Sequence, residues 1–212
     1  MMRRLAGLLA VMLPMVVLAA CSGSGYAVRP YAITRRADVW QNVALDADRR
    51  RLSALLDAWA SARSEIGSDA LAALGPLADP DVVVDAPSPG PGTYRCRLIR
   101  MGRRTGEPAT VPVLVVGEPQ PCTLAADGPV LRLVMQGGTQ QLHGTLYPDD
   151  GRQVFLGTMA LAGEMGRLAY GMDGARDQVG VLRAIGPARW RLELPWPRWQ
   201  SRLLLVDISR AE

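Results

Sequence analysis

The sequence predicts an α+β fold, in which an N-terminal helical pair is followed by an antiparallel β-meander of about eight strands that closes like a barrel. Residues 46–78 carry apolar side chains at helical spacing, whereas residues 93–208 alternate in short segments separated by turn signals. Strands joined by short turns pair antiparallel, and closing such a sheet removes its exposed edges.

The first twenty residues have the three-part layout of a secretory signal. Arg3 and Arg4 form a basic start, residues 5–17 form an apolar run, and residues 18–20 form a small-residue cleavage site. The apolar run is shorter than the about 20 residues that cross a bilayer. We therefore expect a signal peptide over 1–20, a tether over 21–44 and a single domain over 45–208.

Leu-Ala-Ala-Cys, ending at Cys21, resembles the lipobox of bacterial lipoproteins. The resemblance implies acylation of Cys21, and two or more acyl chains anchor a protein stably to a membrane. Ser22 follows, and in similar lipoproteins a serine there permits sorting to the outer membrane. The expected location is the cell envelope, lipid-anchored and facing the periplasm, with the outer membrane favoured. The alternative is a plain secreted protein with a free Cys21.

Residues 46–66 are predicted to form an amphipathic helix. Asp46 is expected to cap its start, and Gly67 to end it in the left-handed conformation. Ser68 then caps a short second helix, which Gly75-Pro76 stops. The predicted apolar stripe of the first helix consists of Leu52, Leu55, Leu56, Trp59 and Ile66.

A connector rich in proline and glycine, residues 80–92, separates the helices from the strands. The predicted strands cover residues 94–100, 111–116, 130–135, 140–147, 153–161, 178–185, 189–194 and 202–208. Residues 148–151, Pro-Asp-Asp-Gly, give a strong hairpin signal. Alternation then places Leu142 and Leu146 on one face and His143, Thr145 and Tyr147 on the other. We expect the apolar face to fill a packed barrel interior; the alternative is a polar interior that forms a ligand cavity.

Three cysteines are present, and the lipobox resemblance assigns Cys21 to lipid. Export places the remaining pair, Cys96 and Cys122, in an oxidising compartment, where a disulfide is expected. A redox or metal pair is the alternative. It has little support, because the chain has no C-x-x-C spacing and only one histidine.

Composition excludes several classes of chemistry. The chain has no lysine, so Schiff-base catalysis and the P-loop lysine are ruled out. The formal charge of +4 is small and scattered, which argues against nucleic-acid binding. Asp149 and Asp150 lie in a turn signal, where turn chemistry explains them. No metal site and no cofactor is expected.

The candidate site residues are polar side chains near the strands. The weak ligand-binding candidates are Arg97, His143, Tyr147, Arg176 and Asp177. Trp196 and Trp199 flank Pro-Arg in a turn and could form a partner-binding or membrane-touching surface. Packing at the base of the barrel is the favoured interpretation for both indoles.

Three stretches, residues 94–102, 138–147 and 176–182, together resemble an alphaproteobacterial envelope lipoprotein family that is classed only as a domain of unknown function, number 4893. The resemblance covers residues 40–208 and implies an envelope location and a single domain. It implies no catalytic residue, because that family has no assigned activity.

The sequence therefore favours a non-enzymatic, lipid-anchored envelope protein that binds a small ligand or an envelope partner. One alternative is an envelope hydrolase acting on cell-wall or lipid material, which would need His143 beside a carboxylate and a nucleophile. The other is a structural or assembly factor, which an exposed Trp196 and Trp199 would favour.

Overall fold

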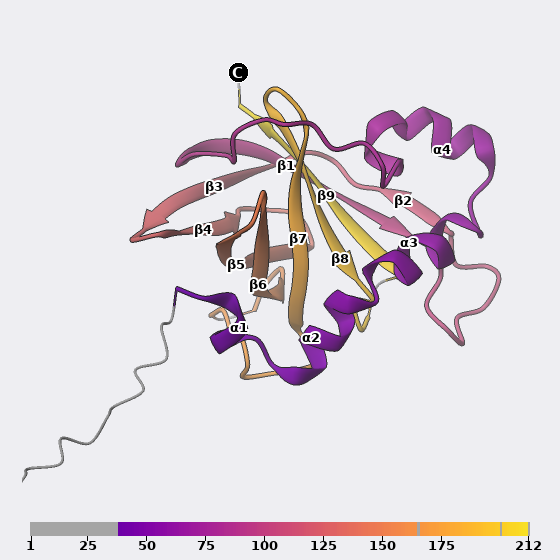
Figure 1. Cartoon of the computed structure of the whole chain (residues 1–212). Coiled ribbons are helices and arrows are strands. Elements are labelled where there is room, and N and C mark those ends of the chain that lie inside the picture. The colour runs from indigo at the N-terminus through magenta and orange to yellow at the C-terminus, as the bar shows by residue number, and fades with distance from the viewer. Residues whose placement is uncertain (1–37, 165, 200, 212) are drawn as a thin grey trace, which may run out of the picture. The chain divides into compact units, whose positions relative to one another are not determined.

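The strands after residue 91 form a closed antiparallel barrel (Figure 1). The structure is a computed structural model that describes residues 38–164, 166–199 and 201–211. The strands are β1 (Gly92–Met101), β2 (Leu114–Val116), β3 (Gln120–Asp127), β4 (Val130–Met135), β5 (Gln140–Asp149), β6 (Arg152–Leu161), β7 (Asp177–Gly186), β8 (Arg189–Pro195) and β9 (Leu203–Arg210).

Barrel closure comes from pairing between the first and last strands. Neighbouring strands follow the order β1-β3-β4-β5-β6-β7-β8-β9, and β9 pairs back onto β1 from Tyr94↔Arg210 to Met101↔Leu203. The α+β class and the antiparallel barrel of eight strands are confirmed.

Short helices precede the barrel: α1 (Trp40–Val43), α2 (Asp46–Ser53), α3 (Leu55–Arg63), α4 (Ser68–Leu74) and the 3-10 turn η1 (Gly75–Ala78). Helix α1 lies inside the range predicted as tether, and its Trp40 packs on the barrel. The signal segment and Cys21 lie outside the described residues. None of the helices within the described ranges is long and apolar enough to cross a bilayer.

The predicted helix over residues 46–66 is broken at Ala54, and its apolar stripe is partly wrong. Ala54 leaves helical geometry with φ −93° and ψ 20°, which changes the phase of α3 relative to α2. Leu56 is 74 % exposed, because α3 turns the side that carries Leu55 and Trp59 toward the barrel and Leu56 lies at the edge of that side. Ala58 and Ala62 take its place on the buried face, beside Leu55, Trp59 and Ile66.

The predicted helix caps are also wrong. The backbone of Leu45 starts α2, so Asp46 is the first helical residue and pairs instead with Arg49 at 2.7 Å. Tight turns after Arg63 end α3 early, and Gly67 has φ −64° as the N-cap of α4. Ser68 is therefore inside α4, with no cap bond from its side chain. The predicted stop at Gly75 is confirmed.

Two strand predictions were wrong: β3 was not predicted, and residues 111–116 were predicted as a barrel strand. The predicted strand 111–116 shrinks to β2, which pairs only with the last three residues of β1. The barrel neighbour of β1 is β3, whose pairing covers Gly92↔Leu124 to Cys96↔Gln120. β3 was not predicted from the sequence, because it contains Pro121 and proline usually interrupts a strand. Gly117 and Pro119 separate β2 from β3 along the edge of β1.

Two apolar layers lie on opposite sides of the barrel wall. The interior is a packed core to which all eight barrel strands contribute, including Tyr94, Leu142, Phe155 and Trp190. The preference for a packed interior is confirmed. The outer layer lies under α3 and η1 and includes Trp59 and Ile99. Figure 1 shows α2 and α3 crossing the outside of β7 and β8.

The β5–β6 hairpin has the predicted register. Asp149 pairs with Arg152 across a two-residue turn, in which Gly151 adopts the φ of +72° that favours glycine. Gly144 lies opposite Gly157, where the two backbones approach closely and the ring of Phe155 packs: a Cβ on Gly144 would clash with Gly157 Cα and come within 2.7 Å of Phe155 Cζ.

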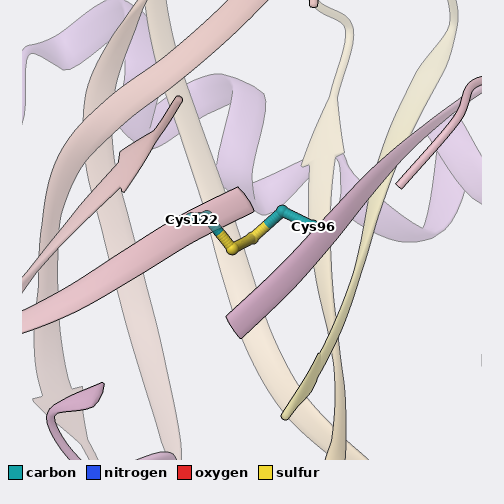
Figure 2. Close-up of a disulfide and its surroundings, with 2 residues drawn as sticks. All are labelled: Cys96 and Cys122. Atoms are coloured by element: carbon teal, nitrogen blue, oxygen red, sulfur yellow. A yellow bond between two sulfur atoms is a disulfide. The ribbon is translucent and has the colours of Figure 1, made fainter. Parts of the chain in front are cut away.

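The disulfide between Cys96 and Cys122 is confirmed (Figure 2). Both half-cystines are fully buried in the barrel interior. Cys96 is also the last residue of β1 that pairs with β3. The bond therefore joins these strands where the partner of β1 changes from β3 to β2.

The connector, residues 80–91, closes one end of the barrel. Ala86 packs against the interior core. Trp190 Nε1 donates to the carbonyl of Pro87 at 3.1 Å, and the Tyr94 hydroxyl donates to that of Gly90 at 2.7 Å. Any opening into the interior must therefore lie at the other end.

Candidate functional site

The opposite end of the barrel is hollowed into a small cleft of about 210 Å³. We call it the barrel mouth; its principal lining residues are Leu98, Arg100, Glu118, Gln120, Met135 and Gln140. Glu118 is exposed at the rim, whereas Met135 is fully buried at the base. The mouth therefore passes from a polar rim to an apolar base.

Strand alternation explains why these side chains converge. On β1, Leu98 and Arg100 continue the inward row that begins with Tyr94 and Cys96. Gln120 lies two residues before Cys122, and Gln140 lies two residues before Leu142. Because Cys122 and Leu142 point into the barrel, both glutamines point inward as well. The cleft opens where β2 and β3 are interrupted along β1, with Gly117 donating to the carbonyl of Leu98 at 2.9 Å.

Arg100 is the chemically distinctive residue of the mouth. Its side chain is partly buried, and it makes no hydrogen bond or ion pair with any residue in the described ranges. A guanidinium stays charged in proteins and presents donors in a planar fork that matches a carboxylate. Arg100 thus offers unused donors beside the apolar side chains of Leu98 and Met135.

Sequence reasoning missed the mouth. Arg100 is one of many arginines, and no local pattern marks it as unpaired. Its inward direction could have been found from the alternation after Cys96, because an arginine in an otherwise apolar inward row is unusual.

His143 and Tyr147 share a cleft of about 300 Å³ on the outer face of the barrel, beside Val43 and Tyr170. His143 Nε2 lies 3.0 Å from the carbonyl of Leu168 and 3.0 Å from the hydroxyl of Thr158. No carboxylate contacts His143 among the residues that the structure describes. Its contacts attach the β6–β7 loop, residues 162–176, to the barrel wall. Burial raises the pKa of the Tyr147 hydroxyl above its ordinary value.

Arg97 does not join that cleft. It pairs with Asp207 at 2.9 Å, and Arg189 pairs with the same carboxylate at 2.7 Å. The three side chains form a ladder across β1, β9 and β8 on the outer face. Hydrogen bonding to Asp207 raises the pKa of Arg189, and this ladder ties together the strands that close the barrel.

Arg176 and Asp177 are adjacent in sequence but lie in different environments. The Arg176 guanidinium donates to Glu164 at 2.6 Å and lies 5.0 Å from the centre of the Trp199 ring. Asp177 is 1 % exposed; its Oδ1 accepts from the Gly171 N–H at 3.0 Å, whereas its Oδ2 has no partner in the described chain. Neither residue reaches the barrel mouth or the cleft of His143.

A second set of polar side chains, Asp48, Arg51 and Tyr170, links α2 to the β6–β7 loop. The Tyr170 hydroxyl donates to Asp48 Oδ2 at 2.7 Å and accepts from the Leu45 N–H at 3.0 Å. Asp48 Oδ1 accepts from Arg51 at 2.8 Å. Burial raises the pKa of Tyr170 and lowers that of Arg51. These closed contacts fix the loop and leave few free groups for a ligand.

The two indoles of the predicted tryptophan surface lie in different environments. Trp196 packs in the outer apolar layer, and its Nε1 donates to the carbonyl of Ala54 at 3.3 Å. The packing interpretation is confirmed for Trp196. It is wrong for Trp199, which is 42 % exposed in the β8–β9 turn because it lies over Arg176 rather than under a helix.

Asp177 makes the stability of the fold depend on pH. Burial raises its carboxyl pKa, so the folded chain favours the neutral acid. That stabilisation is fully present below the unfolded pKa of about 3.9, and it is lost as the pH rises through the raised folded value. Asp177→Asn keeps an oxygen for Gly171 and removes the charge. We expect the variant to gain stability relative to the parent chain as the pH rises from about 4 to about 7, because only the parent carboxyl ionises over that range.

Urea unfolding at a series of pH values measures this effect. Asp150→Asn, in the exposed β5–β6 turn, is the matched control and should follow the parent curve. Parallel curves for Asp177→Asn and the parent chain would contradict the prediction.

Comparison with known proteins adds a family. A family model described as Domain of unknown function (DUF4893) matches residues 40–208. No curated protein matches the chain, and no solved structure matches it. The match spans the described helices and nearly the whole barrel, and it agrees with the resemblance carried by residues 94–102, 138–147 and 176–182.

Proposed function

The chain belongs to the family of the domain of unknown function DUF4893, which supplies no activity, and we propose from its own residues that it is a lipid-anchored envelope protein whose barrel mouth binds a small amphiphilic carboxylate. The binding is non-enzymatic. The observation that carries this function is the inward-facing guanidinium of Arg100, which pairs with no described residue and lies above an apolar base.

The leader and the cysteines support the location. The basic start, the apolar run and the small residues before Cys21 suit export followed by acylation. A buried disulfide is typical of proteins in oxidising compartments such as the periplasm. Ser22 favours the outer membrane, with the barrel facing the periplasm.

The lining of the mouth supports the ligand class. Bidentate contact with a guanidinium favours a carboxylate or a phosphate. Glu118 at the rim disfavours a second negative charge, so we infer a monoanion; this disfavours a phosphate monoester, which carries about two charges at pH 7, and favours a carboxylate. Leu98 and Met135 suit a short apolar chain behind it. A cleft of about 210 Å³ is smaller than drug-sized sites of about 300–1,000 Å³, so it takes only the head of the ligand and a few carbons.

Titration calorimetry with decanoate tests this function. We expect the full chain to bind decanoate and not the neutral analogue decanol, because only the carboxylate pairs with Arg100. A hydrogen bond to a charged group contributes about 1.5–3 kcal/mol, so Arg100→Leu should weaken binding about ten- to hundred-fold. Native mass spectrometry of the purified chain should also find a co-purified carboxylate.

Arg95→Leu is the matched control. Arg95 lies on the same strand with an exposed side chain and has no ion pair among the described residues. It should bind decanoate like the parent chain, and both variants should unfold at the parent midpoint. Equal loss of binding in both variants, or no binding by the parent, would overturn the proposal.

A further inference from the structure

Apolar side chains are exposed on two segments that connect strands at the mouth end of the barrel. Leu168 is 48 % exposed and Met172 is 73 % exposed, both on the β6–β7 loop, and Trp199 is 42 % exposed on the β8–β9 turn. We call these three residues the Trp199 face. Exposed apolar residues that stand singly are common on protein surfaces, whereas an exposed apolar patch is typical of an interaction surface.

The two segments are joined through Arg176. Its guanidinium lies 5.0 Å from the centre of the Trp199 ring, and it borders a shallow hollow of about 480 Å³ together with Leu168 and Arg167. Arg167 and Arg198 are exposed beside the apolar side chains. The face therefore combines an indole, long apolar side chains and exposed arginines, which is the combination that suits a bilayer interface.

The N-terminal end of the described chain reaches the same loop. Trp40 and Val43 of α1 pack in one cluster with Tyr170, and the Leu45 N–H donates to the Tyr170 hydroxyl at 3.0 Å. Figure 1 shows α1 beside the orange loop that leads into β7. Asp38 is the seventeenth residue after Cys21, and a chain of that length spans at most roughly 60 Å. An anchor at Cys21 would thus hold this loop within roughly 60 Å of the membrane.

We propose that the Trp199 face rests on the surface of the phospholipid bilayer to which the chain is anchored. This inference relies on the anchoring part of the proposed function and goes beyond it, because it fixes which end of the barrel meets the lipid. Trp199 sits at the headgroup level, Leu168 and Met172 contact the acyl boundary, and Arg167 and Arg198 meet anionic headgroups.

The orientation also bears on the barrel mouth. Gln140 of the mouth pairs with Leu161, the last residue of β6 before the loop. The mouth consequently opens beside the segment that contacts lipid. An amphiphilic carboxylate could then pass from the bilayer surface to Arg100 without crossing the periplasm.

Spin labels on single introduced cysteines test the contact. Leu168→Cys reports the Trp199 face. Val83→Cys is the matched control, because Val83 is 50 % exposed on the connector that closes the opposite end. The full chain is reconstituted into vesicles of phosphatidylethanolamine and phosphatidylglycerol, and collision rates with oxygen and with an aqueous nickel complex are measured. The chain without an introduced cysteine corrects for labelling of Cys21.

We expect the ratio of oxygen to nickel collisions to rise several-fold at residue 168 when vesicles are present and to stay unchanged at residue 83. Adding Trp199→Glu to the labelled Leu168→Cys chain should reduce that rise. An unchanged ratio at residue 168, or a rise at residue 83 instead, would overturn the proposal. Protection of residue 168 without vesicles would also overturn it, in favour of contact with a second copy.

Two separate measurements distinguish failure of this inference from failure of the proposed function. Intact mass reports whether Cys21 carries acyl chains, and the decanoate titration reports binding at the mouth. If the acyl mass is missing, the chain without acyl groups is mixed with the same vesicles. If residue 168 then remains accessible to water, the surface contact is overturned independently of the anchor.

Discussion

Replacing Glu193 with glutamine should lower the free energy of unfolding by about 3–5 kcal/mol, the cost of breaking a buried ion pair. Glu193 on β8 and its partner Arg191 are both 0 % exposed, and Arg191 Nε donates to Glu193 Oε1 at 2.9 Å. Glu193 Oε2 accepts from Trp59 Nε1 at 3.0 Å. Glutamine fits the space, but it leaves Arg191 without a counter-charge and turns an amide donor toward one of the two N–H groups.

Urea unfolding followed by circular dichroism measures the loss. Glu118→Gln is the control, because Glu118 is exposed and the same change of charge there should cost little. The connector should loosen first in Glu193→Gln, since Arg191 also donates to the carbonyls of Pro76 and Val82. A stability equal to that of the control variant would show that the pair contributes nothing.

Removing the disulfide should cost about 3 kcal/mol of stability. Cys96 and Cys122 are 26 residues apart, so the bond restricts a substantial loop in the unfolded chain. The double variant Cys96→Ser/Cys122→Ser tests this by urea unfolding. The disulfide also holds β1 to β3 beside the mouth, and we therefore expect weaker decanoate binding as well.

Reduction of the parent chain provides the matched comparison. Both half-cystines are fully buried, so dithiothreitol should act only after unfolding, and the reduced chain should unfold at a lower urea concentration than the oxidised chain. Rapid reduction of the native chain, or an unchanged midpoint in the variant, would contradict this account.

Local pattern predicted most of the barrel. Alternation identified seven of its strands, and the turn at residues 148–151 set the register that buries Leu142 and Leu146. The disulfide was identified because two cysteines remain once Cys21 is assigned to lipid. β3 was not predicted, because Pro121 and its polar neighbours give a poor strand signal. The predicted number of eight strands was still reached, because residues 111–116, which form only β2, were counted as a barrel strand.

The candidate site was less accessible to sequence reasoning. Arg97, His143, Arg176 and Asp177 were singled out by residue type, and the partners that hold them are set by the fold. Arg97 meets Asp207, for example, only because β9 pairs with β1. Arg100, two inward positions after Cys96, was passed over, although at the mouth it has no ion pair with any residue that the structure describes.

The sequence by itself determined the α+β class, seven of the eight barrel strands with the inward or outward face of their side chains, the turn at residues 148–151 and the cysteines that pair. These properties depend on residues a few positions apart, and the periods of helix and strand make them readable. Only the tertiary structure decided that β9 closes on β1, that the connector covers one barrel end, and that Arg100 at the other end has no ion-pair partner in the described part of the chain. Those outcomes depend on which distant segments become neighbours, and alternation along one strand carries no information about its partner.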